Sequence, residues 1–565
     1  MHFRTARTAA DYRLKSPVRC GMRESRVMVL SAAIAVVSVL ALTFATLAGC
    51  SGGDSDTNGA NRSGADRPAA ASDKSASSGK SSSKSTPRTS GSRGGAVPSA
   101  GSPSGNDDKP ASNSSQPPES EPRRSLADLV ESGDDKGSTD GGASSDDSKR
   151  PTIAPPPNVD EAVAARAGIR KIEGKHVTVF TDLPEDDEVD ALPQVFDLAV
   201  PQWCAYFDVP VDRVGDWRVN AYVIKEKQRF QAAGLFPDNL PPFLNGFQRG
   251  SELWLYEQPS AYYRRHLLLH EGTHGFMMTF LGGSGPPWYF EGLAELLGTH
   301  RWQDGKLELG IMPPTRDDAP YWGRIKVIRD EYEAGRGLSL VQIMKYGPEA
   351  HRQNEPYGWC WGAAEFFENH PRYRDAFHRM REYLAFDADR FAQRLAALVD
   401  APWTQIEEEW QLFVMNVDYG YDVARAAIDF RKGAPLAAEG TTVEIAADRG
   451  WQSSGILLEE AGTYRLTASG RYQVADKPVV WWCEPGGVTI RYNQGRPLGM
   501  LLAAVHDDEF DGNTVSALAL PQPIGLEREM FVERGGTLYL RINESTGGLA
   551  DNAGTLTVRI EKVKQ

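Results

Sequence analysis

The sequence is poor in cysteine and lacks an excess of positive charge. Only five cysteines occur in 565 residues, and two of them, Cys20 and Cys50, precede the part that we expect to fold. The others, Cys204, Cys360 and Cys483, are scattered, and no CxxC spacing occurs. The sequence therefore predicts neither a disulfide framework nor a thiolate metal site, but small buried cysteines. The formal net charge of −14 argues against a nucleic-acid partner, which needs a basic surface.

The N-terminal quarter lacks aromatic residues over a long stretch. Residues 51–160 consist mostly of Ser, Gly, Asp, Lys and Pro. This composition cannot bury enough apolar surface to offset the loss of chain entropy, so we predict a long disordered linker. A flexible coil of about 100 residues would have a root-mean-square reach of roughly 55 Å.

One apolar run precedes this linker. Residues 28–49 are uninterrupted by charge and follow Arg23 and Arg26, which is the arrangement of a secretory signal. The run ends in "LAGC", which resembles the lipobox of bacterial lipoproteins. This resemblance implies that residues 1–50 are a lipoprotein signal peptide and that Cys50 is lipidated as the new N-terminus. The alternative is an uncleaved membrane helix, because the run is long enough to span a bilayer. Either reading predicts an exported, membrane-anchored protein of the cell envelope.

The remainder mixes strand-like and helix-like patterns and then becomes purely strand-like. A β-branched alternation predicts a strand at 176–182, residues 217–224 are strand-like, and 251–257 places Glu252, Trp254 and Tyr256 on one face of a third strand. Helical periodicity follows from about residue 260. Later runs such as "GTYRLTASG" and "GTLTVRIEKV" are bounded by Gly, Asn or Asp and predict a β-sandwich. We therefore predict an α+β domain over 161–433, with a small mixed sheet plus helices, and an all-β sandwich domain over 434–565.

The pentapeptide HEGTH carries the strongest chemical signal. Positions four apart share a helix face, so His270 and His274 can present imidazoles to one cation while Glu271 faces a water bound to it. Apolar flanks predict a buried helix, in which two histidines without a shared metal are costly to desolvate. A zinc site needs a third protein ligand. The downstream segment "WYFEGLAE" supplies Glu291 and Glu295, one to ligate and the other to hydrogen-bond a ligand histidine.

Two positions exclude the metzincin pattern HExxHxxGxxH, because Met277 and Phe280 stand where its Gly and third His belong. The sequence resembles instead the gluzincin metallopeptidases, the class of thermolysin and aminopeptidase N. The resemblance rests on HExxH, a spacer and "FEGLAE", with Phe290 in place of the more familiar Asn. It implies a zincin-like fold, with Glu291 as the third zinc ligand and Glu295 as the acid that orients a histidine. The segment "PPWYFEGLAE" is also similar to peptidase MA-like proteins of uncharacterised bacterial families.

The gluzincin resemblance implies hydrolysis of peptide bonds, with Glu271 as the general base towards zinc-bound water. No "GAMEN"-like segment is present, which disfavours an aminopeptidase. Gluzincins usually add a Tyr or His that stabilises the oxyanion. We expect Tyr357 to have this role; the alternative is that it is an ordinary tyrosine at a helix interface. His266 and His300 are expected to lie near the metal without binding it, since a zinc takes three protein ligands.

The strand predicted at 251–257 precedes the metal-binding helix directly. We expect it to be an edge strand along which an extended peptide substrate pairs. Trp254 and Tyr256 would then be pocket walls, or core residues as the alternative.

The last segment, "GGTLYLRINESTGGLADNAGTLTVRI", resembles the end of the calcium-dependent galactose-binding lectins. In those proteins a loop holds Ca²⁺, and the ion binds sugar hydroxyls. The resemblance implies possible calcium ligands at Asp551 and Asn552 and a cell-surface glycan as partner, although Asn543 and Glu544 replace the usual Asn-Asp pair. The alternative is a Gly/Asn hairpin in a structural sandwich.

Together these features predict an exported, lipid-anchored zinc metallopeptidase that acts on a peptide or protein substrate. The main alternative is a catalytically silent protein, anchored at the surface, that binds a glycan or another protein. The presence of Glu271 argues against a catalytically silent protein, because a structural metal site does not need that base.

Overall fold

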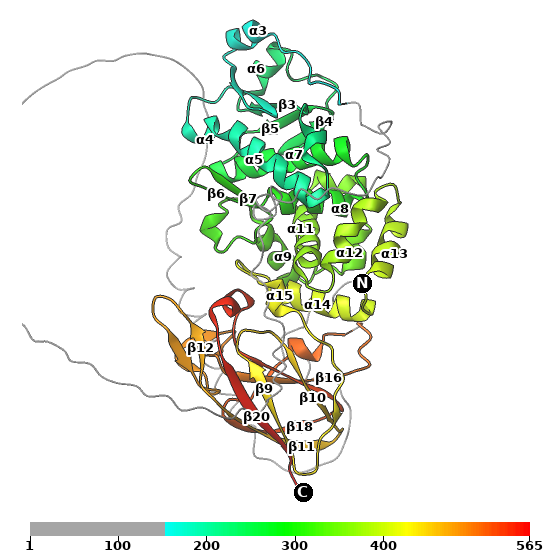
Figure 1. Cartoon of the computed structure of the whole chain (residues 1–565), viewed down its shortest axis with the longest axis vertical. Helices are drawn as coiled ribbons and strands as arrows, with labels where there is room; N and C mark the ends of the chain where they lie inside the picture. Colours follow the sequence, from blue (N-terminus) through cyan, green and yellow to red (C-terminus); the bar gives the residue numbers. More distant parts are fainter. Residues whose placement is uncertain (1–152, 513, 565) are drawn as a thin grey trace, which may run out of the picture. The chain divides into compact units, whose positions relative to one another are not determined.

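The computed structural model describes residues 153–512 and 514–564 (Figure 1). The predicted signal peptide, Cys50 and linker residues 51–152 lie outside the described residues. Among the described residues, no helix is long and apolar enough to cross a bilayer.

A five-stranded mixed sheet opens the described part, in the order β1-β2-β3-β5-β4. The three inner strands are parallel, and each edge strand pairs antiparallel with its neighbour. The predicted strands 176–182, 217–224 and 251–257 are present as β2, β3 and β5. The strands are β1 (Arg170–Glu173), β2 (Val177–Thr181), β3 (Val219–Ile224), β4 (Gly246–Arg249) and β5 (Glu252–Tyr256).

The position of β5 corrects one expectation. Residues 252–256 lie between β3 and β4, so the edge strand is β4 and not the segment 251–257. Trp254 is fully buried between the rings of Tyr222 and Phe247, and Tyr256 stacks on Phe236. Trp254 is therefore a core residue, and Tyr256 is half-buried and packs against the same core.

Helices cover both faces of this sheet (Figure 1). Short α3 (Glu161–Arg166) and α6 (Lys227–Ala232) pack on the face that carries Trp254. The long α5 (Leu192–Phe207) and α7 (Ala261–Phe280) cover the opposite face. The remaining helices extend this second core, and α7 packs on α8, which packs on α11. They include α8 (Pro287–Gly298), α9 (Arg324–Glu333), α11 (Asn354–Asn369), α12 (Arg374–Arg379), α13 (Ala388–Leu398) and α14 (Trp403–Asn416).

A β-hairpin interrupts the region that we expected to be helical throughout. β6 (His300–Gln303) and β7 (Lys306–Leu309) pair antiparallel. The residues between them, Asp304 and Gly305, have φ values of 52° and 73°. This left-handed pair is favoured in a two-residue hairpin turn and ends the helical pattern here.

The C-terminal part is the predicted β-sandwich. Two sheets, in the orders β17-β16-β19-β10-β8 and β18-β11-β20-β9, enclose a shared apolar core. Burial alternates along β11, as expected when one face of a strand meets a core and the other meets water. Two further hairpins, β12–β13 and β14–β15, follow β11. The strands are β8 (Ala434–Pro435), β9 (Thr441–Ala446), β10 (Gln452–Leu458), β11 (Gly462–Ser469), β12 (Tyr472–Ala475), β13 (Trp481–Cys483), β14 (Val488–Asn493), β15 (Arg496–Leu498), β16 (Leu501–His506), β17 (Gln522–Pro523), β18 (Glu527–Val532), β19 (Gly536–Ile542) and β20 (Thr555–Lys562).

The three cysteines of the described part, Cys204, Cys360 and Cys483, are buried and form no disulfide, as predicted. Burial raises the pKa of Cys204 to about 11, so its thiol stays protonated near neutral pH. These cysteines therefore act as small apolar residues.

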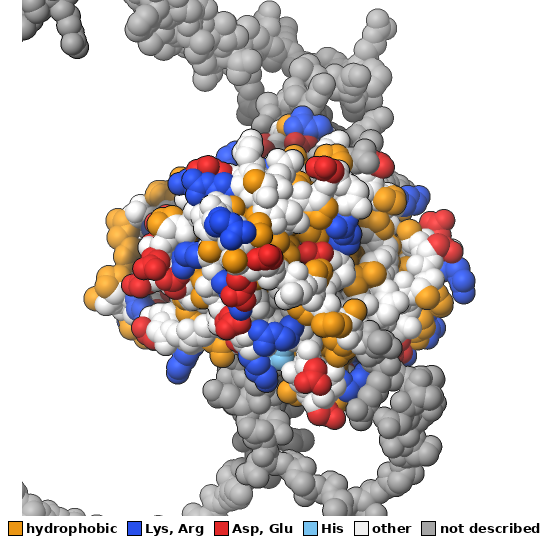
Figure 2. Space-filling model, turned by 90° about the horizontal axis from the view of Figure 1, so that it is seen from above, with side chains coloured by type: hydrophobic (Ala, Val, Ile, Leu, Met, Phe, Trp, Pro, Cys, Tyr) orange, Lys and Arg blue, Asp and Glu red, His pale blue; other side chains and the backbone are white. Residues whose placement is uncertain are grey.

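Charged side chains of both signs are interspersed on the face of the molecule seen in Figure 2. The described residues form no dense positive patch on that face.

Candidate metal centre

Two helices bring the HEGTH and FEGLAE residues face to face. On α7, His270 Nε2 and His274 Nε2 lie 3.0 Å apart. Glu291 Oε2, on α8, lies 3.3 Å from the first nitrogen and 3.4 Å from the second. In a tetrahedral site with metal–ligand bonds of roughly 2.0–2.1 Å, neighbouring ligand atoms are separated by roughly 3.4 Å. The three atoms therefore lie close to the positions of one face of such a tetrahedron.

The burial and charge of His270, His274 and Glu291 favour a shared cation. Both histidines are buried, and Glu291 Oε2 makes no hydrogen bond outside this trio among the described residues. Burial raises the pKa of Glu291, but the neighbouring His274 and His270 outweigh it and hold the pKa at about 2. An ionised carboxylate and two imidazole nitrogens form a donor set that suits a divalent metal.

Glu295 has a different set of partners, although it lies one turn further along α8. Its Oε1 is 3.3 Å from His270 Nδ1, on the side of the ring opposite Glu291. Its Oε2 is 3.2 Å from His266 Nε2 and accepts a hydrogen bond from Arg324 Nε at 2.8 Å, while its Oε1 accepts one from Arg324 Nη2 at 2.8 Å. Burial raises the pKa of Glu295, but the charge of Arg324 dominates and keeps it well below its usual value. A carboxylate in this position fixes the orientation of His270.

Glu271 is on α7, and its carboxylate faces the edge strand β4. A Cβ placed on Gly246 would be 2.4 Å from Glu271 Oε1, so the glycine makes room for the carboxylate. Burial raises the pKa of Glu271 to about 8, while the charge of His270 lowers it and that of Glu291 raises it further.

Tyr357 lies beside these residues, on α11. Its ring centroid is 5.9 Å from that of His270, and the Arg324 guanidinium lies 5.5 Å from the tyrosine ring. Burial raises the pKa of Tyr357, and the nearby charges of Glu291 and Glu271 raise it further. The tyrosine therefore keeps its proton and can donate it in a hydrogen bond.

The other two histidines of this region contact protein groups. His300 Nε2 accepts a hydrogen bond from Arg265 Nε at 3.2 Å, and its Nδ1 lies 2.9 Å from Gly298 O. Burial lowers the pKa of His300 to about 3. His266 shares Glu295 with His270, as described above. Phe290 stacks on His274 with ring centroids 3.9 Å apart, so an apolar ring covers one face of the candidate ligand.

Comparisons with known proteins identify no family. No family model matches the chain, and no curated protein matches it. One similar solved structure is the EclA N-terminal domain, described as a PllA-like lectin, with 20% identity over 22% of this chain and 95% of that chain and a TM-score of 0.17. Another is IMPa from Pseudomonas aeruginosa in complex with an O-glycopeptide, with 9% identity and a TM-score of 0.15. The match covers 68% of this chain and 37% of IMPa, about a third of its length. Similarity at this level supports neither a fold nor a function for this chain.

The candidate calcium residues of the sandwich lie at the end of a short 3-10 helix, η9 (Thr546–Asp551). Asn552 is buried and donates through Nδ2 to Ala447 O at 3.0 Å, while its Oδ1 has no hydrogen-bond partner among the described residues. The main-chain oxygen of Asp551 accepts from Gln473 Nε2 at 2.6 Å. In the described part of the chain, Asp551 joins no cluster of three His, Cys, Asp or Glu side chains.

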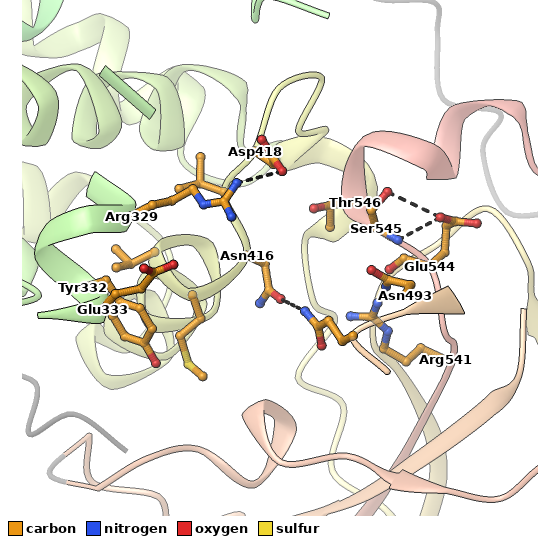
Figure 3. A pocket seen from close by; sticks show the side chains of 14 residues that line it. Arg329, Tyr332, Glu333, Asn416, Asp418, Asn493, Arg541, Glu544, Ser545 and Thr546 are labelled. Carbon is orange, nitrogen blue, oxygen red and sulfur yellow. Dashed lines mark hydrogen bonds and ion pairs between the residues drawn. The ribbon is translucent and has the colours of Figure 1, made fainter. Parts of the chain in front are cut away.

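A polar cavity of about 280 Å³ has none of the metal-binding residues in its lining (Figure 3). Arg329 pairs with Asp418 on one side of it at 3.0 Å, and Arg541 and Glu544 lie on the other side. Sequence reasoning did not find this cavity, because it forms where α9 and α14 meet loops of the sandwich. The rest of its lining consists of Tyr332, Glu333, Val414, Met415, Asn416, Val417, Asn493, Gln494, Ser545 and Thr546.

Proposed function

We propose that this protein is a zinc-dependent metallopeptidase of the gluzincin type, with a zincin-like domain, that hydrolyses peptide bonds. The observation that carries the proposal is the convergence of His270, His274 and Glu291 at separations of 3.0 to 3.4 Å, with Glu271 adjacent on the same helix. These are the residue types and the geometry of a catalytic metal site that leaves its fourth position for water.

The residues of the site divide the chemistry among them. When bound, the metal would activate a water and polarise the scissile carbonyl. Glu271 takes the proton of the attacking water and passes it to the leaving amine nitrogen. Glu295 Oε1 lies 3.3 Å from His270 Nδ1, where it can orient the ring with Nε2 facing Glu291. The Tyr357 hydroxyl, which remains protonated, donates a hydrogen bond to the developing oxyanion.

The edge strand β4 offers a place for the substrate backbone. Among the described strands, β4 has a single neighbour, β5, so its other side can pair with an extended peptide. Because Gly246 lies directly against Glu271, a peptide paired along β4 would run past the catalytic carboxylate. This assignment replaces β5 with β4 as the substrate-binding strand.

A substitution of the proposed base tests this function. Glu271→Gln keeps the size of the side chain but removes its ability to accept a proton. We expect a loss of hydrolysis of roughly 10² to 10⁴-fold on a peptide library, with metal content unchanged. Metal analysis of the purified variant is the control. If zinc disappears together with activity, Glu271 is a ligand and the assigned roles are wrong.

We also propose that the protein is exported and anchored through lipidated Cys50, because residues 28–50 have the pattern of a lipoprotein signal. Fractionation of cells that express Cys50→Ala tests the anchor. If the variant is processed and stays with the membranes like the parent protein, the anchor lies elsewhere.

The second candidate function is binding rather than catalysis, at the cavity of Figure 3. Its arginine, carboxylate and amide side chains can hydrogen-bond the hydroxyls of a glycan, and Tyr332 offers an aromatic face. Binding to a glycan array by Glu271→Gln would support this function. If glycan binding requires calcium and Asp551→Ala abolishes it, the glycan site is the loop at Asp551 and Asn552 instead of the cavity.

A further inference from the structure

The α7–α8 pair contains two overlapping sets of metal-binding side chains. The first is His270, His274 and Glu291; the second is His266, His270 and Glu295. In each set, the ligand atoms lie within 4.8 Å of one another. His270 belongs to both, since its Nε2 faces Glu291 and its Nδ1 faces Glu295. Some feature of the chain must therefore decide which set takes the metal.

Arg324 forms an ion pair with Glu295, which is the carboxylate of the second set. Its Nε and Nη2 donate at 2.8 Å to the two different oxygens of Glu295, which is the bidentate geometry of a strong ion pair. The residue is only 7% exposed, and its side chain is held on other sides as well. It donates to Trp322 O and to Tyr263 Oη, each at 3.3 Å. A fixed positive charge at both oxygens opposes the entry of a second cation.

The local backbone explains how this arginine reaches the site. Gly323, with φ of 70°, directly precedes α9 and turns the chain, so that Arg324 is the first residue of the helix. A glycine adopts this left-handed conformation without strain. The guanidinium then lies 5.8 Å from the ring of Tyr263 and 5.5 Å from that of Tyr357, between the two. Glu291 Oε2 instead faces the Nε2 atoms of His270 and His274, at 3.3 and 3.4 Å, and no arginine pairs with Glu291 among the described residues.

We infer that Arg324 blocks a latent metal site formed by His266, His270 and Glu295, and thereby directs the metal to His270, His274 and Glu291. The inference rests on the metal centre proposed above. Arg324 is a positioning residue in this scheme: it touches neither the substrate nor the metal, and it acts through Glu295.

Four variants test the inference through metal content instead of activity. Glu291→Ala should nearly empty the protein of zinc, because it removes a ligand of the first set. Adding Arg324→Met, which has no charge, should restore about one zinc per chain through the second set. Adding Glu295→Gln or His266→Ala to that double variant should remove the zinc again. Equilibrium dialysis against zinc measures all four proteins, and circular dichroism confirms that each is folded.

Arg265 provides a matched control, because it is a buried arginine next to His266 but pairs with Glu188 and His300. Arg265→Met combined with Glu291→Ala should stay empty. If Arg324→Met prevents folding, Arg324→Gln, which lacks the charge but keeps a hydrogen bond, should restore the zinc in the same way. A folded Arg324 double variant that remains empty overturns the inference. A parent protein that binds no zinc at all overturns the proposed metallopeptidase function instead.

Discussion

Glu291 and Glu295 are the same residue type on one helix face, yet their neighbours give them different roles. Glu291 faces the Nε2 atoms of both histidines, whereas Glu295 meets the back of His270 and the guanidinium of Arg324. Glu291→Ala should therefore nearly empty the metal site. Glu295→Gln should reduce metal affinity or activity by about 10 to 100-fold, because it weakens an orienting contact only.

Equilibrium dialysis of both variants against zinc measures this order. Gln is the better replacement for Glu295, because Ala would leave Arg324 buried beside a cavity and add a folding defect. If Glu295→Gln empties the site while Glu291→Ala keeps the metal, the ligand assignment is reversed.

At the scale of elements, the contact between β4 and α7 sets the position of the proposed base. A Cβ on Gly246 would lie 2.4 Å from Glu271 Oε1 and 3.0 Å from its Cδ, which is too close for the carboxylate to stay in place. Gly246→Ala should therefore displace Glu271 and lower kcat by roughly 10 to 100-fold, with metal content unchanged.

Steady-state kinetics on a peptide substrate, together with metal analysis, tests this prediction. Gly347→Ala is the matched control, because a Cβ there meets no atom within 4 Å and its backbone is not left-handed. Full activity in Gly246→Ala would show that Glu271 is free to move and that β4 does not set its position.

The elements that the sequence predicted are those with a strong local pattern. β2 carries a β-branched alternation, β5 places Glu252, Trp254 and Tyr256 on one face, and α7 follows the spacing of HEGTH. β4 escaped prediction because "GFQR" is short and half-buried at every position, so that it carries no alternation. Its place at the edge depends on pairing with β5, and a sheet order cannot be read from local periodicity.

The residues of the candidate site also divide into those that a local pattern predicted and those that it could not. His270, Glu271 and His274 lie within one helical turn, so their spacing alone placed them together. Arg324 was missed because it reaches Glu295 from 29 residues away, across the contact of two elements whose packing no local pattern encodes. A buried arginine at the start of a helix was the only local signal, and burial is not visible in the sequence.

At the scale of the molecule, α14 joins the helical part to the sandwich through a buried polar cluster. Glu408 accepts a hydrogen bond from Ser516 Oγ at 2.5 Å and lies 3.0 Å from His506 Nε2 on β16. Asp508 lies 3.8 Å from the other ring nitrogen, and Tyr539 packs against the ring. Burial lowers the pKa of His506, but the hydrogen bond and charge of Glu408 outweigh it and raise the pKa above its usual value.

This raised pKa predicts how stability changes with pH. A histidine that binds its proton more tightly in the folded state stabilises the fold fully below its unfolded pKa of about 6.5. That contribution is lost as the pH rises through the higher folded pKa. The thermal unfolding midpoint should therefore fall from pH 6 towards pH 9, and His506→Gln should flatten this fall.

Glu408→Gln should lower the free energy of unfolding by about 1–3 kcal/mol at pH 6, because it leaves a protonated histidine without its buried acceptor. Scanning calorimetry of the three proteins over this pH range measures both effects. An equal slope in wild type and His506→Gln would mean that other groups set the pH dependence and that the cluster does not hold the two parts together.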